Sequence, residues 1–323
     1  MAQQAGTHRE IPEPTKRIVR QRCGFGCVIC GVPLYEYHHM VEWAQAKTHN
    51  AADITLLCDA HHRQATNGLL TSEQVRNFDA KPINPSRGVS TPFGLNLALD
   101  KTRIVHAVIG GNRFSTSQQG HTAFVSIDEM DLVSVRIDDV GGLFLHLNIF
   151  DENNNSSLRV DGNDLVYASD AWDITFEGTT LTLREAHREL LLQITFLPPR
   201  TISIDRASLL FNGIEVIVTP AIVYCAGRVL AGSLLHNCQA GIVLGRDDRG
   251  FAAAVRWSNL PRYSAEQRRK HKNDAFNEQA KLGAIVNPHS ASGTERYVST
   301  VQGCEDFHII NESRETDVSE SKS

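Results

Sequence analysis

The sequence predicts an α+β fold in two parts: a small N-terminal unit of helices and strands, and a larger, mostly β part followed by a short basic helix. Three observations support this expectation. Residues 1–90 hold six of the 14 histidines, residues 93–260 repeat short β-branched runs between turn residues, and residues 261–285 have a helical, basic composition. With 323 residues, 41% hydrophobic and 21% charged, the chain is long enough for two separately packed domains.

The N-terminal domain, residues 1–85, is expected to contain two strands and a helix between flanking helices. Glycines around the first closely spaced cysteines interrupt regular structure, so the first helix ends before them. Short apolar runs of strand length follow, and the second run leads into a polar segment that an aspartate can cap. The expected elements in order are a helix from Thr15 to Arg22, strands at residues 34–41 and 54–57, a short helix from Asp59 to about Asn67, and a helix starting at Thr71, which has capping-box spacing to Gln74.

A proline-rich stretch separates the two predicted domains. The segment from Lys81 to Pro92 contains three prolines, and we expect residues 86–92 to form the linker. Beyond it, runs such as VSVRI, LFLHLNIF and TLTLRE alternate with turns at short, fairly even spacing. This pattern suits a sandwich, a barrel or a β-solenoid for residues 93–260, and periodicity alone does not choose among them.

The C-terminal residues are expected to leave the β domain. Residues 261–285 predict a short basic helix. Residues 286–323 are rich in Ser, Glu and Thr, a composition typical of a disordered tail.

Charge is distributed unevenly along the chain, although the 32 basic and 37 acidic residues give a net charge of only -5. Residues 1–90 carry 10 basic and 8 acidic side chains, whereas residues 91–260 carry 13 and 19. A polyanion such as DNA would therefore meet the two ends of the chain first. The first helix between Arg17 and Arg22 and the basic stretch 262–272 are candidates for phosphate contacts, and a solvated face is an equally good interpretation of both.

The sequence also predicts a compartment. No apolar run approaches the roughly 20 residues that cross a bilayer, and the N-terminus lacks the apolar core of a signal peptide. We therefore expect a cytoplasmic protein with no membrane partner. Seven cysteines in a reducing compartment favour metal binding over a framework of disulfides.

The strongest chemical signal is a pair of matched knuckles. Cys27-x-x-Cys30 is followed 28 residues later by Cys58-x-x-His61, and these soft and borderline ligands have the spacing of a tetrahedral zinc site. All four positions would be filled by protein, so the Zn²⁺ would be structural. The alternative is a redox pair or two buried thiols.

Three further histidines lie beside the knuckles and are not needed for this zinc. His38 and His39 are adjacent between the two knuckles, and His62 directly follows His61. On a helix, His62 is turned about 100° away from His61, so it can point toward a different site. One short helix can therefore support a zinc and contribute to a second metal. A structural role for His38 and His39 in a DNA-binding knuckle is the alternative.

These motifs resemble the HNH endonuclease family. The resemblance rests on CVIC, YHHM, DITLLC and CDAHH in that order, and it covers about Cys23 to Gly68. In that family, two strands and a helix surround one catalytic divalent cation, in the ββα-metal fold. The resemblance therefore implies such a head at the N-terminus. Residues 93–260 resemble no family that we can name.

The resemblance implies roles for individual residues. The second histidine of the HH pair, His39, matches the general base that takes a proton from the attacking water. His38 and His62 match ligands of the catalytic cation, for which Mg²⁺ or another divalent cation is expected. A third ligand falls about one turn after His62, on Thr66 or Asn67, and Asn67 is the preferred assignment. Where the family has an asparagine that orients the base, this chain has Asp53, with Asn50 three residues earlier.

Three functions are compatible with these features. The first is a metal-dependent DNA endonuclease, in host defence, restriction or a mobile element, whose β domain recognises a substrate, an activating ligand, a protein partner or another copy of the chain. The second is a zinc-stabilised DNA-binding adaptor that lacks catalysis. The third is an assembly protein that forms a homo-oligomer through the exposed strand edges of its β domain.

Overall fold

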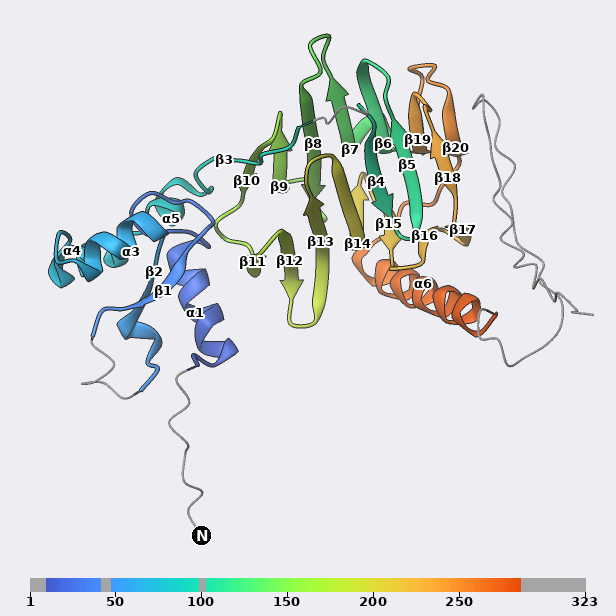
Figure 1. The fold of residues 1–323 in the computed structure, drawn as a ribbon. Helices are drawn as coiled ribbons and strands as arrows, with labels where there is room; N and C mark the ends of the chain where they lie inside the picture. The colour runs from blue at the N-terminus through green and yellow to red at the C-terminus, as the bar shows by residue number, and fades with distance from the viewer. Residues whose placement is uncertain (1–9, 42–47, 99–102, 286–323) are drawn as a thin grey trace, which may run out of the picture.

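The structure is a computed structural model that describes residues 10–41, 48–98 and 103–285 (Figure 1). It has a mixed α+β architecture with an N-terminal unit of short helices and one small sheet, two large sheets, and a C-terminal helix. In this form the predicted fold class is confirmed. The tail predicted at 286–323 lies outside the described residues. No helix in the described ranges is long and apolar enough to cross a membrane.

The N-terminal unit contains the predicted order of strand, strand and helix. β1 and β2 pair antiparallel, with His39 opposite Ile54, and α3 follows directly after β2. Its core consists of apolar side chains from α1, β2 and α4, including Val19, Leu56 and Val75. The elements are α1 Glu13–Cys23, β1 Glu36–His39, η1 Ala51–Asp53, β2 Ile54–Leu57, α3 Asp59–Thr66, α4 Ser72–Ala80 and α5 Ile83–Arg87.

Two predicted helix starts need correction. α1 begins at Glu13, two residues before Thr15, because Pro12 and the proline after Glu13 are suited to the first turn, where no amide donor is needed. The residue that caps α3 is Cys58, and Asp59 is already helical. The capping box between Thr71 and Gln74 is confirmed at the start of α4.

The first large sheet has eight strands in the order β20-β19-β6-β7-β8-β9-β10-β3. The runs VSVRI and LFLHLNIF lie in β7 and β8, as predicted. The strands are β3 Phe93–Gly94, β6 Gly120–Ile127, β7 Met130–Ile137, β8 Leu143–Phe150, β9 Ser156–Asp161, β10 Asp164–Tyr167, β19 Ala240–Leu244 and β20 Ala253–Trp257.

The second sheet has ten strands, of which seven follow the order β11-β12-β13-β14-β15-β16-β17. β4 pairs with β14 and β5, and β18 pairs with β5. The strands are β4 Val105–Ile109, β5 Asn112–Thr116, β11 Asp173–Glu177, β12 Thr180–Ala186, β13 Glu189–Leu197, β14 Thr201–Phe211, β15 Ile214–Val218, β16 Ile222–Cys225, β17 Arg228–Ala231 and β18 Leu234–His236.

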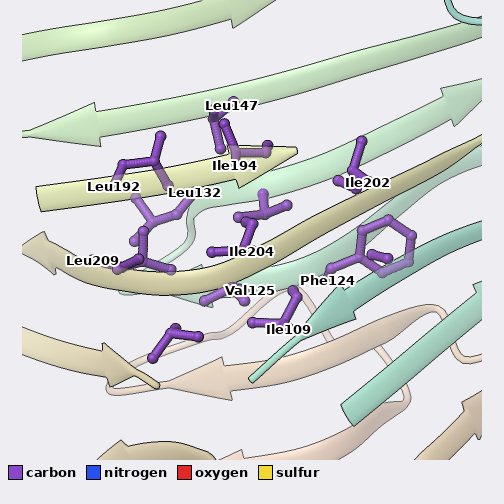
Figure 2. Close-up of a cluster of buried hydrophobic side chains, with 14 of the residues drawn as sticks. Ile109, Phe124, Val125, Leu132, Leu147, Leu192, Ile194, Ile202, Ile204 and Leu209 are labelled. Carbon is purple, nitrogen blue, oxygen red and sulfur yellow. The ribbon is translucent and has the colours of Figure 1, made fainter. Parts of the chain in front are cut away.

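The two large sheets bury one common hydrophobic core. β8 alternates strictly between buried and half-buried residues, so one face of this strand points inward. Figure 2 shows Leu132 and Leu147 of the first sheet beside Ile194 and Leu209 of the second. Most consecutive strands are antiparallel neighbours, which is the arrangement of a sandwich, because the stacked strands of a solenoid run parallel.

The predicted basic helix is α6, Ala265–Ile285, which packs against β15 and β16. His271 is buried, and its Nε2 accepts a hydrogen bond from the Ala226 amide at 2.9 Å. Nδ1 therefore carries the proton and faces the buried Glu215 carboxylate at 3.3 Å. Arg268 pairs with Glu152 at 2.7 Å. Some basic side chains of α6 therefore bind groups of the β part and are not free to bind phosphates.

The two parts of the chain are joined by specific buried contacts. Arg20 of α1 binds the carboxylate of Asp173, the first residue of β11. The Tyr167 hydroxyl donates to the Phe25 carbonyl at 2.6 Å, and the Phe25 side chain belongs to the core of the β part. The proposed linker at 86–92 is also packed there, since its Ser90 is buried and bonded to Tyr167.

Candidate metal centre and histidine cluster

The four knuckle residues come together in the N-terminal unit. Cys27 and Cys30 lie in the turn after α1, Cys58 precedes α3, and His61 lies in the first turn of that helix. Their ligand atoms all lie within 4.8 Å of one another, so the group can hold a metal ion such as zinc. The three cysteines are free thiols. In the described residues this is the one group of three or more His, Cys, Asp or Glu side chains with that property.

The distances within the group fit a tetrahedral ion. The Cys30 and Cys58 Sγ atoms are 3.7 Å apart, and His61 Nδ1 lies 3.1 Å from Cys58 Sγ and 3.4 Å from Cys27 Sγ. Ligands of a tetrahedral zinc with bonds of 2.0 to 2.3 Å are separated by about 3.5 Å. The three sulfur atoms and Nδ1 of His61 are therefore the donors that would hold the ion.

Local hydrogen bonds favour a thiolate at the first knuckle. A hydrogen bond from the Cys30 thiol and hydrogen bonds from backbone amides lower the pKa of Cys27 to about 4, against the opposing effect of burial. A thiolate is the form of cysteine that binds metal. The lowered pKa of Cys27 therefore favours the form of the side chain that binds a cation.

Asn84 of α5 holds the knuckle turn in place, and sequence reasoning missed it. Its Nδ2 donates to the carbonyls of Gly24 at 3.0 Å and Gly31 at 2.9 Å, while its Oδ1 accepts from the Thr91 amide. Gly31 has a φ of +79°, and a Cβ there would clash with Asn84 and Thr91. The sequence gives no spacing signal for this role, because Asn84 lies 53 residues beyond Gly31.

His38 and His62 form a second cluster next to the knuckles. Alternation along β1 puts Glu36 and His38 on one face of the strand, and α3 brings His62 to the same place. The His38 and His62 rings are 5.1 Å apart between centroids, and His62 Nδ1 lies 3.4 Å from Glu36 Oε2. Burial, then the charges of His62 and His39, lower the pKa of His38 to about 4. His38 is therefore neutral near pH 7, which leaves one ring nitrogen with a lone pair for a metal ion.

His39 lies on the other face of β1, and its neighbour is His49. The His39 Nε2 and His49 Nδ1 atoms are 3.4 Å apart, so one ring donates to the other. Burial and the nearby His49 lower the pKa of His39. Sequence reasoning missed His49, because ten residues separate it from His39 and no spacing rule connects them.

Asp53 lies at the end of the 3-10 turn that precedes β2. Its carboxylate accepts from the Asn50 side chain at 3.2 Å, and the Asn50 Oδ1 accepts from the Ala52 amide. The Asp53 carbonyl accepts from the Met40 amide at 2.8 Å, directly after His39. The hydrogen bonds of Asn50 and Asp53 therefore hold the turn before β2 in place next to the end of β1, where His39 lies.

The two candidates for a third cation ligand lie at the end of α3. Thr66 is four residues after His62 and about 40° away around the helix, and its hydroxyl donates to the His62 carbonyl at 3.0 Å. Asn67 caps the helix and is exposed. Five residues correspond to about 140°, so the helix places Thr66 closer than Asn67 to the face that carries His62.

Comparisons with known proteins give no assignment. No family model matches the chain, and neither a curated protein nor a solved structure matches it.

Proposed function

We propose that this protein is a metal-dependent HNH-type endonuclease that hydrolyses phosphodiester bonds in DNA. The observation that carries the proposal is the arrangement of one small unit: a strand with His38 and His39, its antiparallel partner, and a helix that contributes both His61 and His62. One side of the helix completes the knuckle group, and the next residue faces His38. The HNH motifs assign different chemistry to these adjacent histidines.

In this proposal His39 is the general base. The His39 side chain is half-buried, so water can reach it. Because the pKa of His39 is lowered, the imidazole is neutral at pH 7 and can accept a proton from an attacking water. The hydrogen bond with His49 restricts the orientation of the ring. The hydrogen bonds of Asn50 and Asp53 fix the backbone directly after His39.

His38 and His62 are the proposed ligands of the catalytic cation, and Glu36 is an additional oxygen donor beside His62. When bound, a divalent cation such as Mg²⁺ neutralises the charge that builds on the phosphoryl oxygens. The two imidazoles and the carboxylate would hold it on the exposed side of β1. Thr66 and Asn67 are candidates for the remaining protein contact.

The partner proposed for this site is DNA, whereas the three arginines of α1 contact other groups of the protein. Arg20 is buried and bound to Asp173, and Arg22 donates to the carbonyls of Ala51 and Ile54. Arg17 lies over the Trp172 ring. These internal contacts favour a structural role for the three arginines over contacts with phosphate.

A zinc-stabilised DNA-binding adaptor is the second candidate. It is favoured by one observation: among the described side chains, only the knuckle group has three or more ligand atoms close enough for one metal ion. His38, His62 and Glu36 would then be contacts to DNA or to a protein rather than ligands.

Incubation of the purified protein with supercoiled plasmid in Mg²⁺, Mn²⁺ or Ni²⁺ separates these candidates. Nicking or linearisation that EDTA and His39→Ala both abolish is expected for the nuclease. His106→Ala is the matched control, because His106 lies in β4 of the sandwich, and it should cleave like the wild type. Zinc-loaded protein that binds the plasmid but leaves it uncut in all three metals would support the adaptor instead.

A further inference from the structure

A cavity of about 730 Å³ lies between α6 and the outer face of the second sheet. Along β14, Leu209 points into the core of the sandwich, while Arg206 and Ser208 line the cavity. The cavity is therefore separated from the core by the sheet itself. Its volume is within the usual range of small-molecule sites, which is about 300 to 1,000 Å³.

Three arginines in this cavity have no acidic partner. Within residues 10–41, 48–98 and 103–285, the side chains of Arg188, Arg206 and Arg269 form no ion pair or hydrogen bond, and all three residues are exposed. Arg268, in contrast, is bound to Glu152. Arginine side chains of this kind are suited to bidentate contacts with phosphate oxygens.

The acidic residues of the cavity offset only part of the positive charge. The lining contains five basic and four acidic side chains. Glu152 and Glu185 each face a cation of α6, and the Asp151 carboxylate accepts from the amides of Asn153 and Asn155 within its own turn. Glu189 is the remaining carboxylate. The positive charge in excess of these pairs is available to an anionic ligand.

The same cavity exposes an aromatic ring. Phe276 of α6 lines it with a relative exposure of 58%, so the ring is open to solvent. Leu190, Ile217 and Pro220 add an apolar wall. A flat ring can stack on a phenylalanine while its polar edge stays in water.

We propose that this cavity binds a nucleotide, with the phosphates on the free arginines and the base against Phe276. The unpaired guanidinium groups suit the phosphates of a nucleotide. The exposed aromatic ring and the apolar wall suit its base. The proposal is independent of nuclease activity, because every residue that it uses belongs to the β part or to α6.

Isothermal titration calorimetry with the four ribonucleoside triphosphates tests the proposal on the full chain. At least one triphosphate is expected to bind, and the corresponding nucleoside and inorganic phosphate should each bind at least tenfold more weakly. No heat with any triphosphate at millimolar concentration would overturn the proposal. Inorganic phosphate binding as tightly as the triphosphate would overturn the assignment to a nucleotide.

Variants locate the binding. Arg206→Glu and Arg269→Glu should each weaken binding at least tenfold, and Phe276→Ala should weaken it several-fold. Arg159→Glu is the control, because Arg159 is exposed on β9 in the other sheet. Circular dichroism would verify that each variant is folded. Wild-type affinity in the cavity variants, or equal loss in Arg159→Glu, would show that the ligand binds elsewhere or responds to net charge only.

Discussion

Arg20 and Asp173, 153 residues apart in the chain, form a bidentate ion pair that joins the two parts of the protein. Arg20 Nε lies 2.8 Å from Asp173 Oδ1, and an Nη2 contact of 2.7 Å reaches Oδ2. Both residues are buried. Although burial opposes the charge, hydrogen bonds to Asp173 and Glu13 raise the pKa of Arg20. The guanidinium therefore stays charged, and Asp173 is needed to balance it.

Asp173→Ala should destabilise the protein by about 3 to 5 kcal/mol, because it leaves a buried guanidinium without its main partner. Urea unfolding monitored by circular dichroism measures the change. Asp59→Ala is the control, since Asp59 forms an exposed pair with Arg63 and its loss should cost about 0.5 kcal/mol. Equal effects of the two substitutions would contradict a structural role for the buried pair.

Cys30→Ser should remove the metal from the knuckle group and unfold the N-terminal unit, because a structural zinc supplies much of the stability of so small a unit. Metal analysis of the purified chain is expected to find about one zinc per wild-type molecule and almost none in the variant. Cys225→Ser is the control, as that thiol is buried in the β part and should leave the zinc content unchanged. A folded, zinc-loaded Cys30→Ser protein would disprove that these four residues hold the metal together.

His49→Ala should move the acidic limb of the cleavage profile to higher pH. The proposed base must be neutral, so activity falls as the pH drops through the pKa of His39. Burial and His49 lower that pKa, and removing His49 takes away one of these two effects. Cleavage rates between pH 5 and 8 are the measurement. An unchanged limb would separate His49 from the titration that controls cleavage.

Asp53→Asn should be tolerated, because the new side chain retains an oxygen that can accept from Asn50. Asn50→Ala should instead cost about 1 kcal/mol, since it removes both the cap of the 3-10 turn and the donor to Asp53. It should also reduce cleavage by loosening the backbone after His39. Thermal melting and plasmid assays on both variants check these effects. A more damaging Asp53→Asn would show that the negative charge itself is required.

Much of the local structure followed from the sequence. Apolar runs of strand length located β2, β7, β8 and β12, since alternation and β-branched residues act over a few neighbours. Capping chemistry located the start of α4 at Thr71. The spacing of Cys27, Cys30, Cys58 and His61 predicted a group that the structure brings together, because four soft ligands at knuckle spacing have few other uses.

Only the tertiary structure decided what joins distant segments. His49 beside His39, Asn84 under the knuckle turn and Asp173 on Arg20 leave no periodic or spacing signal in the chain. The unpaired arginines of the cavity were also invisible, because whether a cation has a partner depends on which strands and helix meet around it. The sequence determined the short-range elements and the metal-ligand set, through interactions between near neighbours. Long-range packing decided the partner of a buried charge such as Arg20, because burial removes the water that would otherwise solvate it.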